Sequence, residues 1–359
     1  IGNLMKTKIT NISTICTWSP AEGKLVILSD VEILVEDSTI IQISKTVGGA
    51  EEEIDADGAL ITPGFVDSHT HPIFSGNRAN EFGMRVSGKS YEEIASMGGG
   101  IISSINGVRN ASEEQLLEEC LERINFFLVH GTTTIEAKSG YGLTIEDELK
   151  SLRVIKRLNE SSPLDIIPTF MGAHAFPPEF KNDHQGYVRL ICEEMIPVVA
   201  EENLAEFCDV FCENGYFTLD DSRKILETAK EYGLTPRLHA DEFVDSGAAG
   251  LSAEVGAISA DHLMAVSDEG IQKMAESGVI ATLLPGTTLF LGKNKYAPGR
   301  KIIDSGCDVA LATDFNPGSC TIQSMPQIIS LANLYCGLST DEAFKGATWN
   351  GAKAINRGK

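Results

Sequence analysis

The spacing of apolar and polar residues changes near residue 58. Before that point, short apolar runs rich in β-branched residues alternate with polar turns, and none has helical periodicity. The runs cover residues 9–12, 24–28, 31–35 and 39–43. After that point, apolar runs of strand length alternate with longer segments of helical periodicity. The sequence therefore predicts a small β domain over residues 1–58 and a larger domain over residues 59–359.

The larger domain repeats strand, loop and helix. Strands are predicted at 59–67, 132–137, 165–173, 206–211, 235–240, 257–261, 279–284 and 308–313. Helices are predicted at 113–130, 145–160, 185–201, 219–232, 246–255, 268–277 and 321–335. Eight strands alternating with helices favour an α/β fold, a closed (β/α)₈ TIM-like barrel. A doubly wound open sheet is the alternative, but no G-x-G-x-x-G follows any of these strands.

Composition narrows the possible partners and the compartment. A net charge of −22 disfavours nucleic acid, because phosphates would be repelled. The eight cysteines are scattered and lack disulfide or zinc-ribbon spacing, so Cys208 and Cys212 are interpreted as small core residues. No apolar run approaches the roughly 20 residues that cross a bilayer, and residues 1–6 have no signal-peptide core. These features predict a cytoplasmic protein that is not bound to membranes.

The strongest candidate for chemistry is the sequence Asp67-Ser68-His69-Thr70-His71, which ends the first strand of the larger domain. Alternation along a strand places His69 and His71 on one face, with Asp67 beside them. Two imidazoles so placed suit one metal ion such as zinc, whereas two polar histidines in a turn are the alternative.

Five of the seven histidines follow this pattern along the chain, each at the predicted C-terminal end of a strand: His69, His71, His174, His239 and His262. In a barrel these ends form one rim, where active sites lie. His69, His71, His239 and Asp314 supply three nitrogens and one oxygen for a metal ion and leave a position for water. Such an ion would activate that water for attack on a carbonyl or amidine carbon, and Asp314 is placed to accept its proton. For Asp314 alone, the alternative is a cap on the following helix.

Glu242 and His262 lie beside ligand-bearing strands and are predicted to orient water and transfer protons. Two structural alternatives stay open: His262 as a core histidine paired with Asp261, and Glu242 as a hydrogen-bond partner of His239.

The loops supply candidate substrate contacts. Arg78 offers a two-pronged grip on a carboxylate, or else forms a surface pair with Glu81. Tyr141 either projects its hydroxyl into the cavity or packs on its glycine-rich loop. Asn316 and Gly318 follow Asp314 in a tight turn, where Gly318 is predicted to expose a backbone N–H.

Together these segments resemble the amidohydrolase superfamily and, within it, the imidazolonepropionase family. The resemblance covers about residues 20–355 and rests on residues 67–71 (DSHTH), 76–82 (GNRANEF), 138–143 (KSGYGL), 170–174 (FMGAH), 239–243 (HADEF) and 313–319 (TDFNPGS). It implies hydrolysis of 4-imidazolone-5-propanoate to N-formimidoyl-L-glutamate in histidine degradation. It also implies one zinc or iron ion on His69, His71, His239 and Asp314, and a homodimer.

The same resemblance implies the substrate contacts and catalytic groups. The implied substrate-binding residues are Arg78, Tyr141, His174, Glu242, Asn316, Gly318 and Ser319, with Arg78 on the propionate. Glu242, His262 and Asp314 would transfer protons.

Two features depart from the wider superfamily. The fourth strand ends without the lysine that bridges two metals in many relatives, so one ion is expected. Relatives also continue after residue 354 with strands that complete the small β domain, so this chain is expected to lack them. The competing functions are a nucleobase-type deaminase with the same metal site, or a non-catalytic barrel scaffold. In a deaminase of neutral bases, Arg78 would have no carboxylate to bind. A scaffold would not need metal ligands that converge.

Overall fold

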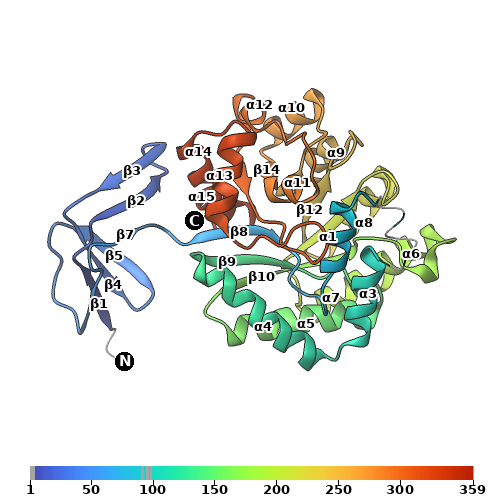
Figure 1. The fold of residues 1–359 in the computed structure, drawn as a ribbon, viewed down its shortest axis with the longest axis horizontal. Helices are drawn as coiled ribbons and strands as arrows, with labels where there is room; N and C mark the ends of the chain where they lie inside the picture. The colour runs from blue at the N-terminus through green and yellow to red at the C-terminus, as the bar shows by residue number, and fades with distance from the viewer. Residues whose placement is uncertain (1–4, 90–92, 94–96, 98, 359) are drawn as a thin grey trace. The chain divides into compact units, whose positions relative to one another are not determined.

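The computed structural model describes residues 5–89, 93, 97 and 99–358. Its contacts divide the chain into two compact units, one ending at Gly64 and one beginning at Phe65 (Figure 1). The predicted boundary between residues 58 and 59 stays a prediction.

In the described part of the first unit, all regular secondary structure is β-strand. The strands are β1 (Lys6–Thr10), β2 (Thr14–Ser19), β3 (Lys24–Leu28), β4 (Glu32–Glu36), β5 (Thr39–Ser44), β6 (Glu52–Asp55) and β7 (Leu60–Ile61). They form a four-stranded sheet in the order β5-β4-β1-β6 and a three-stranded sheet in the order β3-β2-β7. Ile12, Ile15 and Ile33 form its small core. The small N-terminal β domain is thereby confirmed.

The second unit is an eight-stranded parallel barrel. Its strands are β8 (Phe65–Thr70), β9 (Thr132–Lys138), β10 (Asp165–Ala173), β11 (Phe207–Cys212), β12 (Thr235–Ala240), β13 (Ser259–His262), β14 (Ile280–Leu283) and β15 (Val309–Leu311). Each strand pairs with its sequence neighbour. The ring nearly closes where Thr70 bridges Phe315, and the His71 N–H donates to the Phe315 carbonyl at 2.8 Å. Sequential order and first-to-last contact confirm the barrel, and the alternative of an open doubly wound sheet is wrong.

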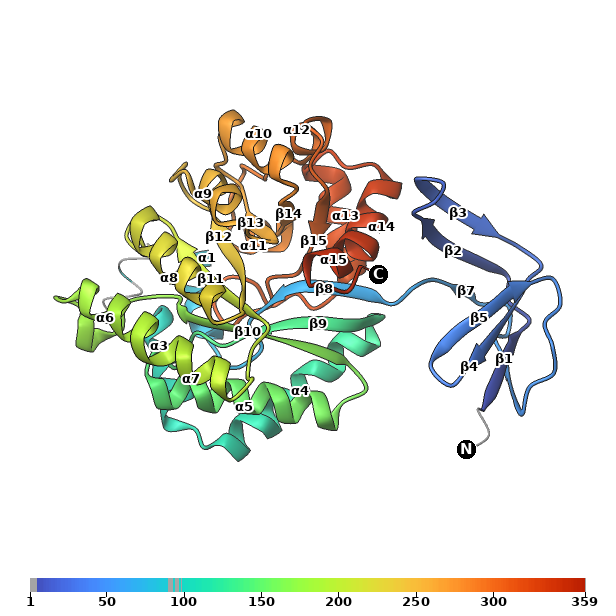
Figure 2. The same ribbon diagram turned by 180° about the vertical axis from the view of Figure 1, so that it is seen from behind.

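Helices surround the barrel (Figure 2). They are α1 (Ala79–Val86), α3 (Ile101–Asn110), α4 (Glu113–Val129), α5 (Ile145–Ser161), α6 (His184–Leu190), α7 (Ile196–Glu201), α8 (Leu219–Glu231), α9 (Ala248–Val255), α10 (Asp268–Ser277), α11 (Pro285–Phe290), α12 (Gly299–Asp304), α13 (Met325–Tyr335), α14 (Thr340–Ala347) and α15 (Trp349–Ala354). In α4, Leu116, Cys120 and Ile124 are buried, and their four-residue spacing places them on one face of the helix. Ser112 begins that helix with a capping box.

Two predicted elements differ from the structure. The strand predicted at 59–67 is two strands, because Pro63 lacks the N–H that a continuous sheet ladder needs. Its first part, β7, pairs with β2 in the first unit. The helix predicted at 185–201 contains a π-helical segment, Ile191–Met195, between α6 and α7, just before Pro197.

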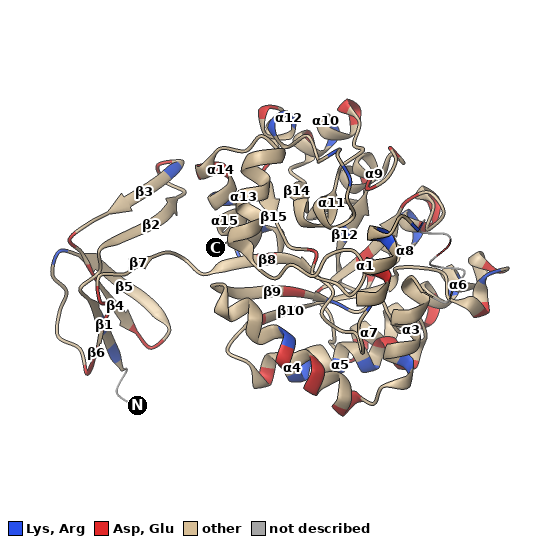
Figure 3. Ribbon diagram, viewed as in Figure 1, with Lys and Arg blue, Asp and Glu red and all other residues tan. Residues whose placement is uncertain are grey.

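Charged residues of both signs lie on the helices (Figure 3), and the two cysteines predicted to be core residues are buried. Acidic residues are distributed over the helices around the barrel, with Lys and Arg between them (Figure 3). Cys208 and Cys212 are buried on β11. In the described part of the chain, no helix has the length and apolarity to cross a membrane.

Candidate metal centre

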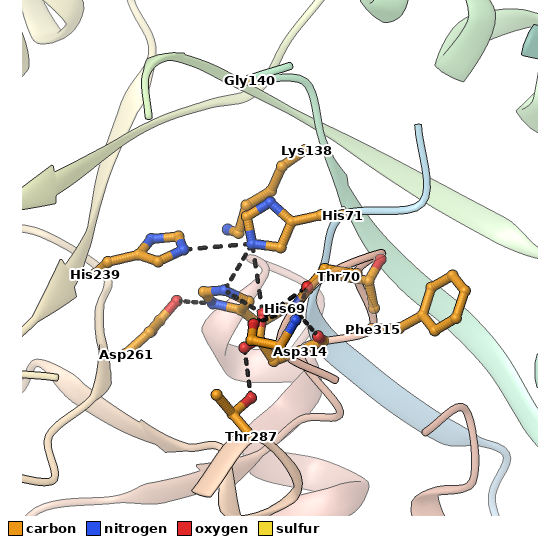
Figure 4. A network of polar contacts seen from close by, with 12 residues as sticks. His69, Thr70, His71, Lys138, Gly140, His239, Asp261, Thr287, Asp314 and Phe315 are labelled. Atoms are coloured by element: carbon orange, nitrogen blue, oxygen red, sulfur yellow. Dashed lines mark hydrogen bonds and ion pairs between the residues drawn. The ribbon is translucent and has the colours of Figure 1, made fainter. Parts of the chain in front are cut away.

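Three imidazoles and one carboxylate converge at the C-terminal ends of the barrel strands. Nε2 of His71, just after β8, lies 3.2 Å from Nε2 of His69 and 3.3 Å from Nε2 of His239 on β12. Oδ1 of Asp314, after β15, lies 3.6 Å from Nε2 of His69 and 3.5 Å from that of His71. All four side chains are buried. Figure 4 shows them pointing toward one point, so the structure brings together the four predicted ligands.

Two buried carboxylates hold the outer nitrogens of these imidazoles. Nδ1 of His69 lies 2.6 Å from Oδ2 of Asp261, and Nδ1 of His239 lies 3.0 Å from Oδ1 of Asp209. Because an ionised carboxylate only accepts hydrogen bonds, each Nδ1 carries the proton and each Nε2 presents a lone pair to the centre.

This donor arrangement fits a divalent metal ion. Ligand atoms about 2.0–2.1 Å from a tetrahedral ion lie about 3.3–3.4 Å from one another, close to the nitrogen separations found here. Burial, followed by nearby positive charges, lowers the pKa of His69 and of His71 well below the usual histidine value. Both imidazoles are therefore neutral, the form that binds metal. The Nε2 lone pairs of these imidazoles face one another with no proton between them. They repel each other, and a cation bound between them removes that repulsion.

Buried cations hold the two outer carboxylates. Nζ of Lys138 lies 2.7 Å from both Asp209 and Glu136, and the Arg237 guanidinium donates to Asp261 at 3.0 Å. Although burial alone would raise it, the pKa of Asp209 lies well below its usual value because of Lys138 and His239. These cation–carboxylate–imidazole chains were not predicted from sequence. A charged residue in an apolar run, such as Asp209 within β11, was the available signal, because a buried charge requires a partner.

Asp67 does not approach the centre, although it precedes the two histidines on the same face of β8. It accepts hydrogen bonds from the backbone N–H and the hydroxyl of Thr313, at 3.0 and 2.6 Å. It therefore joins the first barrel strand to the segment after the last one.

Glu242 and His262 lie beside the centre. Oε2 of Glu242 is 3.7 Å from Nε2 of His262, whose ring centroid is 5.2 Å from that of His239. Burial, then the negative charge of Asp314, raises the pKa of Glu242 well above its usual value. Burial also raises the pKa of Asp314, to about 6. Without a cation beside them, both carboxyl groups therefore hold a proton more readily than exposed ones do.

Both structural alternatives for this pair are wrong. Asp209, and not Glu242, is the hydrogen-bond partner of His239. Asp261 pairs with His69 and Arg237 and makes no hydrogen bond to His262 among the described contacts.

Tyr141 and His174 close one side of the centre. The His174 ring stacks on His71 with centroids 5.1 Å apart, and the Tyr141 ring lies 5.1 Å from His174. Burial, then His239, lowers the pKa of His174 to about 3, so its imidazole is neutral. The loop that carries Tyr141 is tied down by buried Glu148, which accepts the backbone N–H groups of residues 140, 142 and 143.

Arg78 forms the predicted pair with Glu81, but the pair is not at the surface. Nε and Nη2 of Arg78 donate to the two carboxylate oxygens at 3.0 and 2.7 Å, and the side chains are only 10% and 11% exposed.

The turn after Asp314 differs in one respect from its prediction. The Gly318 N–H is not free, because it donates to Oδ1 of Asn316 at 2.8 Å. The Ser319 N–H donates to the same oxygen at 2.7 Å, so Asn316 organises the turn.

Sequence comparison agrees with the fold and the donor cluster. The amidohydrolase family matches residues 60–359. An imidazolonepropionase from Geobacillus thermodenitrificans is 54% identical, with 86% of this chain and 73% of the relative covered. One from Clostridium tetani is 47% identical, with 99% and 87% covered.

Solved structures of lower identity share the fold. A guanine deaminase from C. acetobutylicum with bound guanine aligns with a TM-score of 0.70 at 17% identity, covering 99% of this chain and 87% of that one. A 5-methylcytosine deaminase from Klebsiella pneumoniae aligns with a TM-score of 0.72 at 16% identity, covering 98% and 87%.

The barrel and its rim of buried imidazoles and carboxylates define a metal-dependent hydrolase of the amidohydrolase class. Identity of about half over most of the chain places it further: it belongs to the imidazolonepropionase family.

Proposed function

We propose that this enzyme hydrolyses 4-imidazolone-5-propanoate to N-formimidoyl-L-glutamate in histidine degradation. The observation that carries the proposal is the convergence of His69, His71, His239 and Asp314 at a rim that also bears a part-buried arginine, Arg78. The four ligands suit a metal ion that promotes the opening of a ring C–N bond, and Arg78 suits the carboxylate of the substrate.

These four ligands would hold one divalent ion, which we propose to be zinc or iron. When bound, such an ion polarises a carbonyl oxygen and lowers the pKa of water toward about 7. Imidazole nitrogens and a single carboxylate oxygen suit both metals.

The remaining side chains provide proton transfer. Water adds its oxygen to the ring carbonyl carbon, the bond from that carbon to the ring nitrogen breaks, and the nitrogen takes up a proton. Asp314, whose buried carboxylate lies beside the imidazole nitrogens of His69 and His71, is suited to accept the proton of the water. Glu242, whose pKa is raised by burial, is suited to donate to the departing nitrogen, and Nε2 of His262 lies 3.7 Å from its carboxyl group.

Contacts along the rim would position the substrate. We propose that Tyr141, His174 and Glu242 face the ring, where the imidazole of His174, stacked on His71, and the tilted phenol ring of Tyr141 form one wall. Arg78 would bind the propionate, and the turn of Asn316, Gly318 and Ser319 would lie against it.

The test is spectrophotometric turnover of 4-imidazolone-5-propanoate by metal-loaded and chelated protein. Full activity is expected with zinc or iron, and almost none after chelation, with activity restored when metal is returned. Activity that survives removal of all metal, verified by elemental analysis, would contradict the proposal.

Assembly and location complete the proposal. We propose a homodimer in the cytoplasm, acting on a small molecule without nucleic acid or membrane partners. The net charge of −22 supports the exclusion of nucleic acid. Analytical ultracentrifugation of the protein tests the oligomeric state.

A further inference from the structure

The arginine predicted to bind the substrate carboxylate is already neutralised. Glu81 occupies the Nε and Nη2 edge of Arg78 with both of its oxygens, and the pair is largely removed from water. Nη1 of Arg78 makes no hydrogen bond among the described contacts and can still donate. The Arg78–Glu81 pair nevertheless has no net charge. It can orient an incoming anion through Nη1, but it does not neutralise the negative charge of that anion.

A second guanidinium lies beside this pair. Arg85, about two helical turns beyond Arg78 and one beyond Glu81, donates from Nη1 to the Gly318 carbonyl at 3.0 Å. Its guanidinium carbon lies 5.4 Å from the centre of the Phe290 ring and 5.8 Å from that of Phe82, which holds it by cation–π contact.

Both guanidiniums meet at Gly318. A β-carbon on this glycine would lie 2.2 Å from Nη1 of Arg78, so that arginine packs directly on the backbone whose carbonyl Arg85 holds. Gly318 belongs to the turn of the proposed substrate site. The two cations are therefore neighbours at the same part of the rim.

Arg85 carries a charge that no described carboxylate neutralises. Among the described residues it forms no ion pair, and its buried Nε has no hydrogen-bond partner. Burial, then the charge of Arg78, lowers the pKa of Arg85, and Glu81, which makes no ion pair with it among the described contacts, offsets this only in part. Arg78, Glu81 and Arg85 together carry one net positive charge, which matches one carboxylate.

We propose that Arg85 is a specificity-determining residue: it supplies the uncompensated positive charge that selects the carboxylate of the substrate, while Arg78 supplies the directional contact. This inference rests on the proposed function and deepens it. The chemical class selected is a ring amide that carries an anionic side chain, in preference to a neutral one.

The test compares kcat and KM for 4-imidazolone-5-propanoate and for its neutral propanamide. Arg85→Met should raise KM for the acid by about 10- to 100-fold, the usual range for losing a charged contact, with kcat changed much less. KM for the amide should stay nearly constant, so the preference for acid over amide falls. Arg85→Lys, which keeps the charge, should retain most of the preference, and Arg223→Met on α8 is the matched surface control.

A charge-compensation variant separates this role from a structural one. Glu81→Gln frees the charge of Arg78, so it should strengthen the acid preference in the wild-type background and restore it in Arg85→Met. If Arg85 has a purely structural role, the acid preference should not be restored, and the double variant should be less active than either single variant. If Arg85→Met fails to fold, Glu81→Gln alone decides, because an unchanged or weaker acid preference overturns the proposal.

Failure of the proposed function can be distinguished from failure of the role proposed for Arg85. If the metal-loaded wild type turns over neither compound, the assigned reaction is wrong. If the wild type works on the acid, and Arg85→Met loses acid and amide activity equally, only the role of Arg85 is wrong.

Discussion

His69 donates its Nδ1–H to Asp261 across 2.6 Å, although 192 positions separate the two residues in the chain. Both side chains are fully buried. The carboxylate thereby fixes the tautomer and orientation of an imidazole whose other nitrogen faces the donor cluster.

The first prediction concerns this contact. Asp261→Asn should weaken metal binding by about 10- to 100-fold, because an amide does not hold the imidazole in one tautomer or raise its basicity. Competition with a chromophoric chelator measures the affinity directly. Asp268→Asn, at an exposed position on α10, is the control and should bind metal like the wild type. Equal affinities for the two variants would show that Asp261 does not support the ligand.

The second prediction concerns Lys138, whose ammonium lies between Glu136 and Asp209 with no exposure to water. Lys138→Met leaves two buried carboxylates without their cation and should lower the free energy of unfolding by about 3–5 kcal/mol. Urea titration in chelator, where metal binding does not contribute, measures it. Lys293→Met, in an exposed loop, should change stability by less than about 0.5 kcal/mol. A comparable loss in both variants would contradict the structural role of the buried ion pair.

The third prediction concerns the loop of Tyr141. Glu148→Ala removes the acceptor of three backbone N–H groups, so the loop should lose its fixed conformation. We expect KM for the substrate to rise about tenfold or more, since each lost hydrogen bond to a charged group is worth about 1.5–3 kcal/mol. Glu146→Ala, exposed on the same helix, serves as the control. An unchanged KM in Glu148→Ala would show that this loop does not depend on the carboxylate.

The fourth prediction concerns pH. Burial raises the pKa of Asp308, but hydrogen bonds from Lys353 on α15 and Lys345 on α14 outweigh it, so the pKa lies below its usual 3.8. Because the unfolded state then binds protons more readily, Asp308 stabilises the fold above about pH 3.8, and this is lost as the pH falls through the folded pKa.

Thermal unfolding tests this sign. Asp308→Asn should lower Tm at pH 7, where a partly exposed pair is worth about 1 kcal/mol or less, and the difference from wild type should shrink below pH 3.8. Asp341→Asn, at an exposed position on α14, is the control. A difference that persists unchanged at low pH would exclude ionisation of Asp308 as its cause.

Much of the fold was predictable because its signals are local. Period-two and period-3.6 patterns and the turn residues between them identified the eight barrel strands and the longest helices around them. Among the described helices, several of the shorter ones were missed, because six to ten residues show too little of a helical period: α1, α3, α11, α12, α14 and α15. The split at Pro63 was also missed, because the strand pattern there continues through the proline.

The sequence by itself determined that histidines and an aspartate stand at the ends of barrel strands, because alternation and turn residues act over a few positions. Only the tertiary structure decided which carboxylate holds each imidazole and that Arg85 lies beside Arg78 at Gly318. Those pairings depend on the register of strands and on the packing of loops from distant parts of the chain. No local pattern encodes such distances, which are fixed only when the barrel closes.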